Sequence, residues 1–170
     1  KISVYLYPSG ESKHRFIGTS NTNIAKPWRK EIHLTLDSFD DTFRHELVHV
    51  LAAKIGLPVV RASARMGLNE GLATAIDWNW GEFSPHEYSA ALQREKLLGD
   101  PEELFAYTGF ATQQSSYAYI VTGSISRYLI DRFGVKSFKE VFPAAHFVES
   151  YGMPLHALIE DWENFLRTVD

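Results

Sequence analysis

The sequence has no cysteine, no long apolar run and no strong charge of either sign. Without cysteine there is no disulfide, no thiolate nucleophile and no cysteine-based zinc knuckle, so any metal ion would be held by histidines and carboxylates. No apolar stretch approaches the roughly 20 residues that span a bilayer, which argues against membrane insertion of this segment. A formal net charge of −4 gives no reason to expect nucleic acid or an anionic membrane as a partner.

What is present is the composition of one folded domain. The 170 residues are 45% hydrophobic and 14% aromatic, which is enough to bury a core. The chain begins at Lys1 with no initiator methionine and no signal-like segment. This favours a single compact domain, residues 1–170, excised from a longer or processed chain that carries additional domains. The compartment stays open, with an extracytoplasmic or secreted location slightly favoured.

Two N-terminal segments alternate between apolar and polar residues, as half-buried strands do. They are "ISVYLY" at 2–7 and "EIHLTL" at 31–36. Residues 8–30 are rich in glycine, proline and asparagine and are expected to form a loop, with at most one short element near 16–17. Because strands come first and helices follow, we predict an α+β fold with a small, mainly antiparallel sheet in residues 1–36 and helices in 37–170.

The segment "DSFDDTFRHELVHVLAAKIGLP" (37–58) carries the strongest helix signals. Asp37 or Ser38 can cap its N-terminus, apolar residues recur at helical spacing, and Gly56 and Pro58 mark its end. Gly134 closes the longest of the remaining predicted helices. These helices span 68–78, 84–98, 117–134, 135–142 and 154–169.

The first helix contains "HELVH" at 45–49, the pattern His-Glu-x-x-His. A four-residue step on a helix turns about 400°, so His45 and His49 lie one turn apart on one face and can converge on one ion. Glu46 is displaced by about 100° from His45, which places its carboxylate beside the ion without requiring it to bind. A general base for a metal-activated water needs this arrangement.

Catalytic zinc usually has three protein ligands and one open position, so a third ligand is needed. "NEGLA" (69–73) supplies Glu70 after twenty intervening residues, which leaves enough chain for one helix to end and a second to return. Gly71 beside it would let these two helices approach closely. The alternative is an accidental match on a solvated helix face; the preceding strand and the correctly spaced Glu70 favour a metal site.

With these residues the chain resembles the gluzincin metallopeptidases, the clan of thermolysin and aminopeptidase N, and is similar to compact peptidase MA-like domains. The resemblance covers about residues 30–166. The matching segments are "HELVH", "NEGLA", the strand "EIHLTL" before the motif helix, "YAYIVTGSISRYLIDRFG" (117–134) and, more weakly, "LIEDWENFL" (158–166). It implies a thermolysin-like catalytic core and one Zn²⁺ ion.

The resemblance also implies roles for individual residues. His45, His49 and Glu70 would be the zinc ligands and Glu46 the general base. A tyrosine that stabilises the oxyanion is best matched by Tyr119, with Tyr117 as a rival. Thermolysin-like enzymes also have an aspartate four residues after the ligand glutamate. This chain has Thr74 at that position, which leaves the partner of the histidines unassigned; the candidate for it is Asp77, almost one turn further along.

The implied activity is hydrolysis of peptide bonds in a peptide or protein substrate. The strand over 31–36 is expected to be an edge strand over the cleft that binds an extended peptide by strand addition. The residues involved would be Glu31, Ile32, His33, Leu34 and Thr35. No Gly-x-Met-Glu-Asn-type segment, which reads the free amine in aminopeptidases, lies upstream, so an endopeptidase or specialised peptidase is favoured. The alternatives are a binding domain without turnover and a structural zinc site.

Other histidines and aromatic residues are assigned mostly to structure. His33 is expected at the surface more readily than in a cleft. Trp78 and Trp80 are expected in the core, although either could line a subsite. The remaining histidines have no partner at ligand spacing and are expected at the surface or as satisfied core residues; they are His14, His86, His146 and His156.

Overall fold

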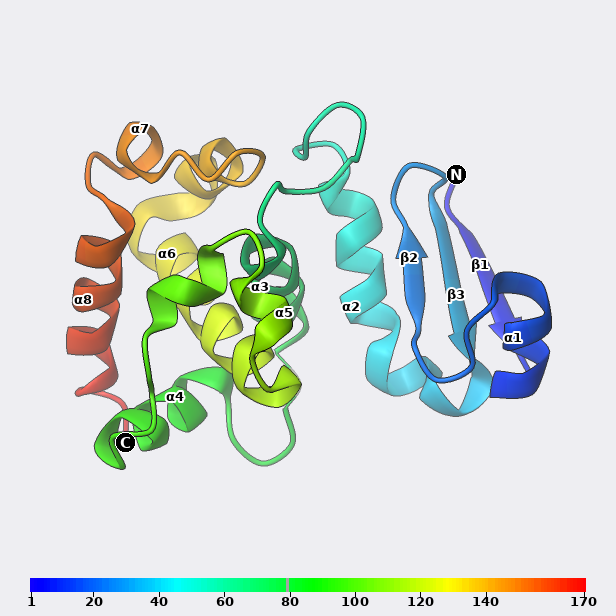
Figure 1. Ribbon diagram of the computed structural model, residues 1–170, viewed down its shortest axis with the longest axis horizontal. Helices are drawn as coiled ribbons and strands as arrows, with labels where there is room; N and C mark the ends of the chain where they lie inside the picture. The colour runs from blue at the N-terminus through cyan, green and yellow to red at the C-terminus, as the bar shows by residue number, and fades with distance from the viewer. Residues whose placement is uncertain (79) are drawn as a thin grey trace. The chain divides into compact units, whose positions relative to one another are not determined.

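The computed structural model describes residues 1–78 and 80–170. It divides into two compact units, Lys1–Ala62 and Ser63–Asp170 (Figure 1). The first holds a small sheet and two α-helices, and the second is helical throughout its regular structure as described. The α+β class predicted from the sequence is therefore confirmed. The helix that carries "HELVH" belongs to the same unit as the strands.

The sheet of the first unit has three strands in the order β1-β3-β2. Strand β1 (Ser3–Tyr7) runs parallel to β3 (Glu31–Thr35), and β2 (Ile24–Lys26) pairs antiparallel with β3. The prediction of a mainly antiparallel sheet is wrong, because the longest pairing is the parallel one. The chain between β1 and β3 forms a helix and the short β2 before it returns, and such a crossover delivers β3 in the same direction as β1.

Strand β3 is the central strand, so the prediction that residues 31–36 form an edge strand is also wrong. Ile32 and Leu34 are fully buried on one face, and His33 and Thr35 on the other face are buried as well. Alternation in the sequence shows that one face of a strand is apolar, but it carries no information on which strand lies at the edge. The backbone at 31–33 is paired on both sides.

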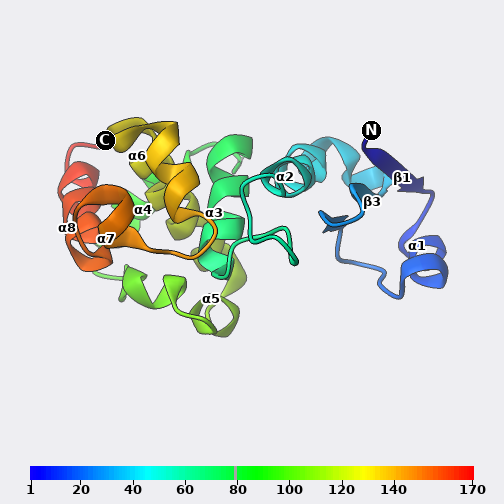
Figure 2. The same cartoon turned by 90° about the horizontal axis from the view of Figure 1, so that it is seen from above.

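Helix α1 (Gly10–Ile17) lies inside the segment that was expected to be a loop. Ser9 caps its N-terminus by accepting a hydrogen bond from the Ser12 amide, and Gly18 ends it in the left-handed conformation, with φ of 80°. Its sequence, "GESKHRFI", has few apolar residues, so periodicity gave little signal. Figure 2 shows α1 and α2 on opposite sides of the sheet.

Helix α2 (Phe39–Ala52) follows a short 3₁₀ turn, η1 (Leu36–Ser38), and confirms the predicted motif helix. Ser38 occupies the N-cap position, although its side chain donates to the Thr35 carbonyl instead of capping the helix. The helix packs an apolar face onto the sheet, where it forms the core of this unit. That core comprises Ile32, Leu34 and Val50, with Ile2, Ala25, Phe39, Phe43 and Leu47 packed against them.

The second unit is organised around a long helix, α6 (Ser115–Val141), which packs against α3 (Met66–Asp77). Gly134 interrupts α6 with φ of 87° and ψ of 159°, so the predicted helix end at Gly134 is confirmed. The other elements are α4 (Pro85–Arg94), η2 (Pro101–Phe105), α5 (Gly109–Thr112), α7 (Phe147–Tyr151) and α8 (Leu155–Leu166). None of the helices in the described part of the chain combines the length and apolarity needed to cross a bilayer.

Helices α3 and α6 come into close contact at two glycines. A Cβ on Gly71 would lie 2.7 Å from the Thr122 carbonyl oxygen and closer still to the Ser126 hydroxyl. A Cβ on Gly123 would overlap the Thr74 side chain. The sequence predicts that Gly71 allows a close approach between α3 and the motif helix. This prediction is wrong, because Gly71 faces α6 instead.

Candidate metal centre

Helix α2 presents His45 and His49 one turn apart, as the four-residue spacing predicts. Their ring centroids are 4.9 Å apart and their planes are inclined by 77°, so the rings meet edge to face. Both residues are half-buried. Phe43, Leu47 and Val50 pack on the sheet. Because His45 and His49 each lie two residues, about 200°, beyond Phe43 and Leu47, their positions point away from this apolar core.

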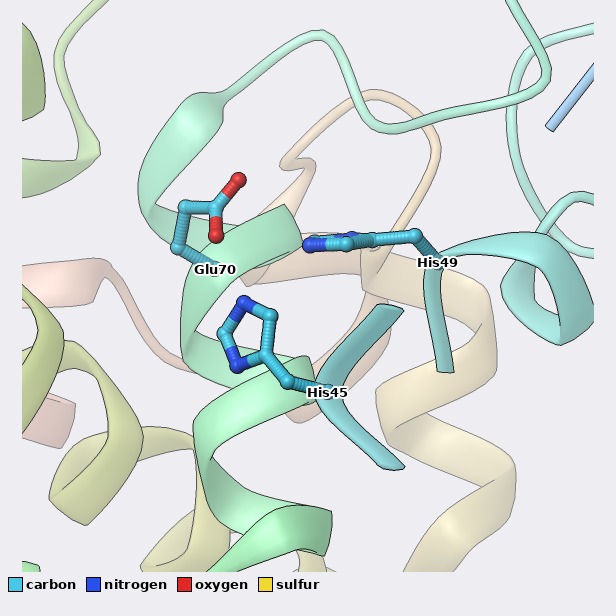
Figure 3. Close-up of side chains that lie close together, drawn as sticks. All are labelled: His45, His49 and Glu70. Atoms are coloured by element: carbon cyan, nitrogen blue, oxygen red, sulfur yellow. The ribbon is translucent and has the colours of Figure 1, made fainter. Parts of the chain in front are cut away.

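The third predicted ligand, Glu70, lies in the first half of α3. The ligand atoms of His45, His49 and Glu70 lie within 4.8 Å of one another, and their side chains point toward one another (Figure 3). The three residues are half-buried. This His-His-Glu group could hold a metal ion. The donor set consists of two imidazoles and one carboxylate, with no thiolate in the chain.

Asn69, which precedes Glu70, anchors the segment that leads into α3. Its side-chain oxygen accepts a hydrogen bond from the Ser63 amide at 2.8 Å, and its amide nitrogen donates to the carbonyls of Ser63 and Arg65 at 3.1 Å each. Arg65 in turn stacks over the Tyr107 ring at 3.4 Å from its centroid. Asn69 of "NEGLA" therefore fixes the start of α3. No role for this asparagine was predicted from the sequence.

The rest of α3 is packed against α6 and leaves the glutamate side as its less buried face. Leu68, Ala73 and Ala75 are fully buried. Thr74, at the position where the resemblance would place an aspartate, is also fully buried, and its hydroxyl has no hydrogen-bond partner in the part of the chain described. The Thr74 side chain packs on Gly123, so this residue contributes to the contact between α3 and α6.

The two candidate tyrosines of α6 lie in different surroundings. The Tyr117 hydroxyl donates to the Leu98 carbonyl, and burial, followed by the charges of Asp100 and Glu103, raises the pKa of Tyr117. Tyr119 has its ring packed edge to face on Phe110, with centroids 5.2 Å apart. The hydroxyl of Tyr117 is thus occupied in a structural contact.

The Tyr119 ring also lies near that of Trp80, with centroids 6.3 Å apart. Trp78 ends α3 in the left-handed conformation, with φ of 58°, and packs edge to face on His86. Both tryptophans are half-buried, so neither is the fully buried core residue that the sequence favoured.

His33 is buried, in contrast to its predicted surface position. Its Nδ1 lies 3.0 Å from the Tyr7 hydroxyl, its ring stacks on Tyr5 with centroids 4.8 Å apart, and burial lowers its pKa. Because the backbone of β3 is paired on both sides at this point, it offers no free edge to a peptide. The predicted substrate-binding residues Glu31, Ile32, His33, Leu34 and Thr35 are therefore part of the central strand.

A buried lysine is linked through hydrogen bonds to the start of the motif helix, and it was not predicted from the sequence. Lys13 of α1 is 1% exposed and donates to the Asn23 side-chain oxygen at 3.0 Å. The amide nitrogen of Asn23 donates to the hydroxyls of Ser38 and Thr42 at 2.9 Å each. Burial lowers the pKa of Lys13, and the charges of Asp37 and Glu46 act in the opposite direction. This network fixes the first turn of α2, and its cation lies in the field of Glu46.

His86 is a half-buried histidine whose ring has partners on both sides, Trp78 and Phe165. Trp162 Nε1 donates to the Ser124 hydroxyl oxygen at 3.0 Å, and that oxygen lies 2.8 Å from His86 Nδ1. The Ser124 oxygen can accept this bond while its own hydrogen donates to Nδ1, so the contact is compatible with a neutral imidazole. Burial lowers the pKa of His86 to about 4.

Searches with this sequence and structure against protein-family models, curated proteins and solved structures found no match. The site is therefore interpreted from its own residues.

Proposed function

We propose that this protein is a zinc-dependent metallopeptidase of the gluzincin type. The observation that carries the proposal is the position of Glu46, the residue next to His45 in a group of two histidines and a glutamate that could hold a metal ion. A site that only stores or binds a metal needs the three ligands. It has no need of a carboxylate one residue further along the helix, whereas a hydrolase needs such a base.

In this proposal His45, His49 and Glu70 hold the ion and leave a position open. When bound, zinc would polarise the substrate carbonyl and lower the pKa of its coordinated water to about 7. An ion with only two imidazoles and one carboxylate keeps a net positive charge, which suits both effects. The substrate would be a peptide or protein, with the amide as the group attacked.

Glu46 would accept the proton of the attacking water and deliver it to the leaving nitrogen, so one carboxylate serves first as base and then as acid. The Tyr119 hydroxyl would donate a hydrogen bond to the oxygen on which negative charge develops. Tyr119 is chosen because, of the two tyrosines, it is the better positional match in the resemblance. Lys13, buried behind α2, would act on Glu46 only through its charge, since it is 1% exposed and cannot reach a substrate.

The test is hydrolysis of a broad peptide library by the zinc-loaded protein. Glu46→Gln keeps the size of the side chain and removes the base, so it should lower the rate by about 10²–10⁴-fold. Glu149→Gln, at an exposed position of α7, makes the same chemical change elsewhere and should leave the rate unchanged. Equal activity of wild type and Glu46→Gln, or no activity in either, would instead indicate a binding domain without turnover.

A further inference from the structure

The first unit contains a groove of about 630 Å³ at the C-terminal end of α2. Three segments contribute to it: the N-terminus before β1, the turn between β2 and β3, and the end of α2 with the loop that follows. The side chains that matter for its chemistry are Lys1, Trp28, Lys30, Leu51, Lys54 and Arg61. A volume of this size is within the range of pockets that bind ligands.

The groove is cationic. Four of its lining side chains carry a positive charge, and among the described residues that line it no carboxylate is present. The C-terminus of α2 contributes about half a negative charge, which one lysine, Lys54, is enough to balance. The positive charge of the groove agrees with that of the first unit as a whole. Residues 1–62 contain nine lysines and arginines and six acidic residues, a net charge of +3. Residues 63–170 hold eight against fifteen, a net charge of −7.

The groove also has an exposed apolar part. Trp28 is 62% exposed and Leu51 is 50% exposed, although both are large apolar side chains. Beside Arg61, Val59 and Val60 are also exposed. Exposed apolar groups that gather beside cations favour a ligand that has both an apolar and an anionic part, because each part then finds its counterpart.

Two of the four cationic residues have a left-handed backbone conformation, which favours glycine. Lys30 has φ of 57° and Arg61 has φ of 56°. Each conformation is held by local hydrogen bonds, from the Lys30 amide to the Pro27 carbonyl and from the Arg61 amide to the Leu57 carbonyl. Strained positions of this kind cluster at sites of function. Here both strained residues carry charged side chains that line the same groove. Glycine would have adopted these conformations with less backbone strain.

We propose that this groove binds an acidic peptide segment that carries a large apolar side chain. Its carboxylates would pair with Lys30, Lys54 and Arg61, and its apolar side chain would pack on Trp28 and Leu51. A short peptide lies within about one Debye length of the groove and experiences mainly the local positive charge. A charged membrane surface or a nucleic acid extends far beyond it and would also meet the repulsion of a chain with net charge −4.

The groove begins at Val50, the residue after His49 in α2. Val50 and Leu51, which line the groove, follow His49 directly in α2, so the groove and the motif are neighbours on the same helix. Binding of the peptide does not depend on the proposed peptidase activity.

Fluorescence anisotropy with a labelled synthetic peptide of alternating glutamate and leucine tests the proposal. The full chain is used with the Glu46→Gln substitution, so that binding is measured without cleavage and a failed peptidase assay does not affect the result. We expect saturable binding that weakens with salt, and no binding of the peptide with lysine in place of glutamate. Lys54→Glu with Arg61→Glu should weaken binding by at least about tenfold, because two attractions become repulsions.

The matched control is Lys136→Glu with Lys139→Glu, which makes the same change of net charge at two exposed lysines of the second unit and should leave the affinity unchanged. Trp28→Ala should weaken binding about three- to tenfold without changing its salt dependence, since it removes an apolar contact. The proposal is overturned if both charge-reversed pairs weaken binding equally, if the lysine peptide binds as well, or if phosphatidylserine vesicles bind and the acidic peptide does not.

Discussion

Acidification from about pH 7.5 to about pH 5 should destabilise the protein through His86. In the folded state its Nδ1 lies 2.8 Å from the Ser124 hydroxyl oxygen, which accepts a hydrogen bond from Trp162, and burial favours the neutral imidazole. In the unfolded chain the imidazole is free to take up a proton. Because the folded pKa lies below the unfolded one, the unfolded state binds more protons as the pH falls, and the stability that His86 contributes is lost.

The size of the effect follows from the two pKa values. With an ordinary value of 6.5 in the unfolded chain and about 4 in the folded protein, the contribution is complete above pH 6.5 and is lost as the pH falls toward 4. Between pH 7.5 and pH 5 the loss in the free energy of unfolding is about 2 kcal/mol. Carboxylates add their own pH dependence, so the difference between wild type and a His86 variant isolates the contribution of the histidine.

Urea denaturation at the two pH values, followed by tryptophan fluorescence, measures this loss. His86→Gln cannot be protonated and should lose about 2 kcal/mol less than wild type over the interval, whatever its stability at pH 7.5. His156→Gln, at an exposed position of α8, should behave as wild type does. An equal loss of stability in wild type and His86→Gln would refute the assignment of a neutral, buried histidine.

Three further predictions concern packing and buried charge. Gly71→Ala should lower stability by about 1–3 kcal/mol, seen as a lower Tm, because its Cβ would press on the Thr122 carbonyl; an unchanged Tm would show that α3 and α6 can separate freely. Leu34→Ala should cost about 2–5 kcal/mol in denaturant titrations, since the side chain is fully buried in the sheet core, and a cost below 1 kcal/mol would contradict that packing. Asn23→Ala should cost about 1.5–3 kcal/mol and more than Lys13→Met, because it leaves a buried ammonium without its acceptor whereas the methionine removes the charge; the reverse order would contradict the network.

The parts of the fold that were predicted correctly are those fixed by local sequence. The motif helix was found because Phe39, Phe43 and Leu47 recur at helical spacing, and the same residues pack on the sheet. Gly134 was recognised as a helix end because only a residue without a Cβ adopts φ of 87° at low cost. The shared face of His45 and His49 follows from helix geometry alone.

The parts that could not be predicted depend on contacts between distant segments. The central position of β3 and its parallel pairing with β1 depend on the path of residues 8–30, where α1 has few apolar residues to reveal it. The burial of Lys13 depends on Asn23 and on the carboxylates around it. In the candidate site, Glu70 could be chosen by spacing, whereas the packing of Thr74 on Gly123 is a tertiary contact.

The most direct test of the central claim is the zinc content of the purified, zinc-equilibrated protein, measured by elemental analysis beside a His45→Ala, His49→Ala double variant. The account predicts one zinc ion per wild-type chain and almost none in the variant, since it keeps only one of the three ligands. An exposed-histidine variant, His14→Ala with His156→Ala, should retain the full content. A wild-type protein without zinc, or equal zinc in wild type and the double variant, would contradict the metal centre.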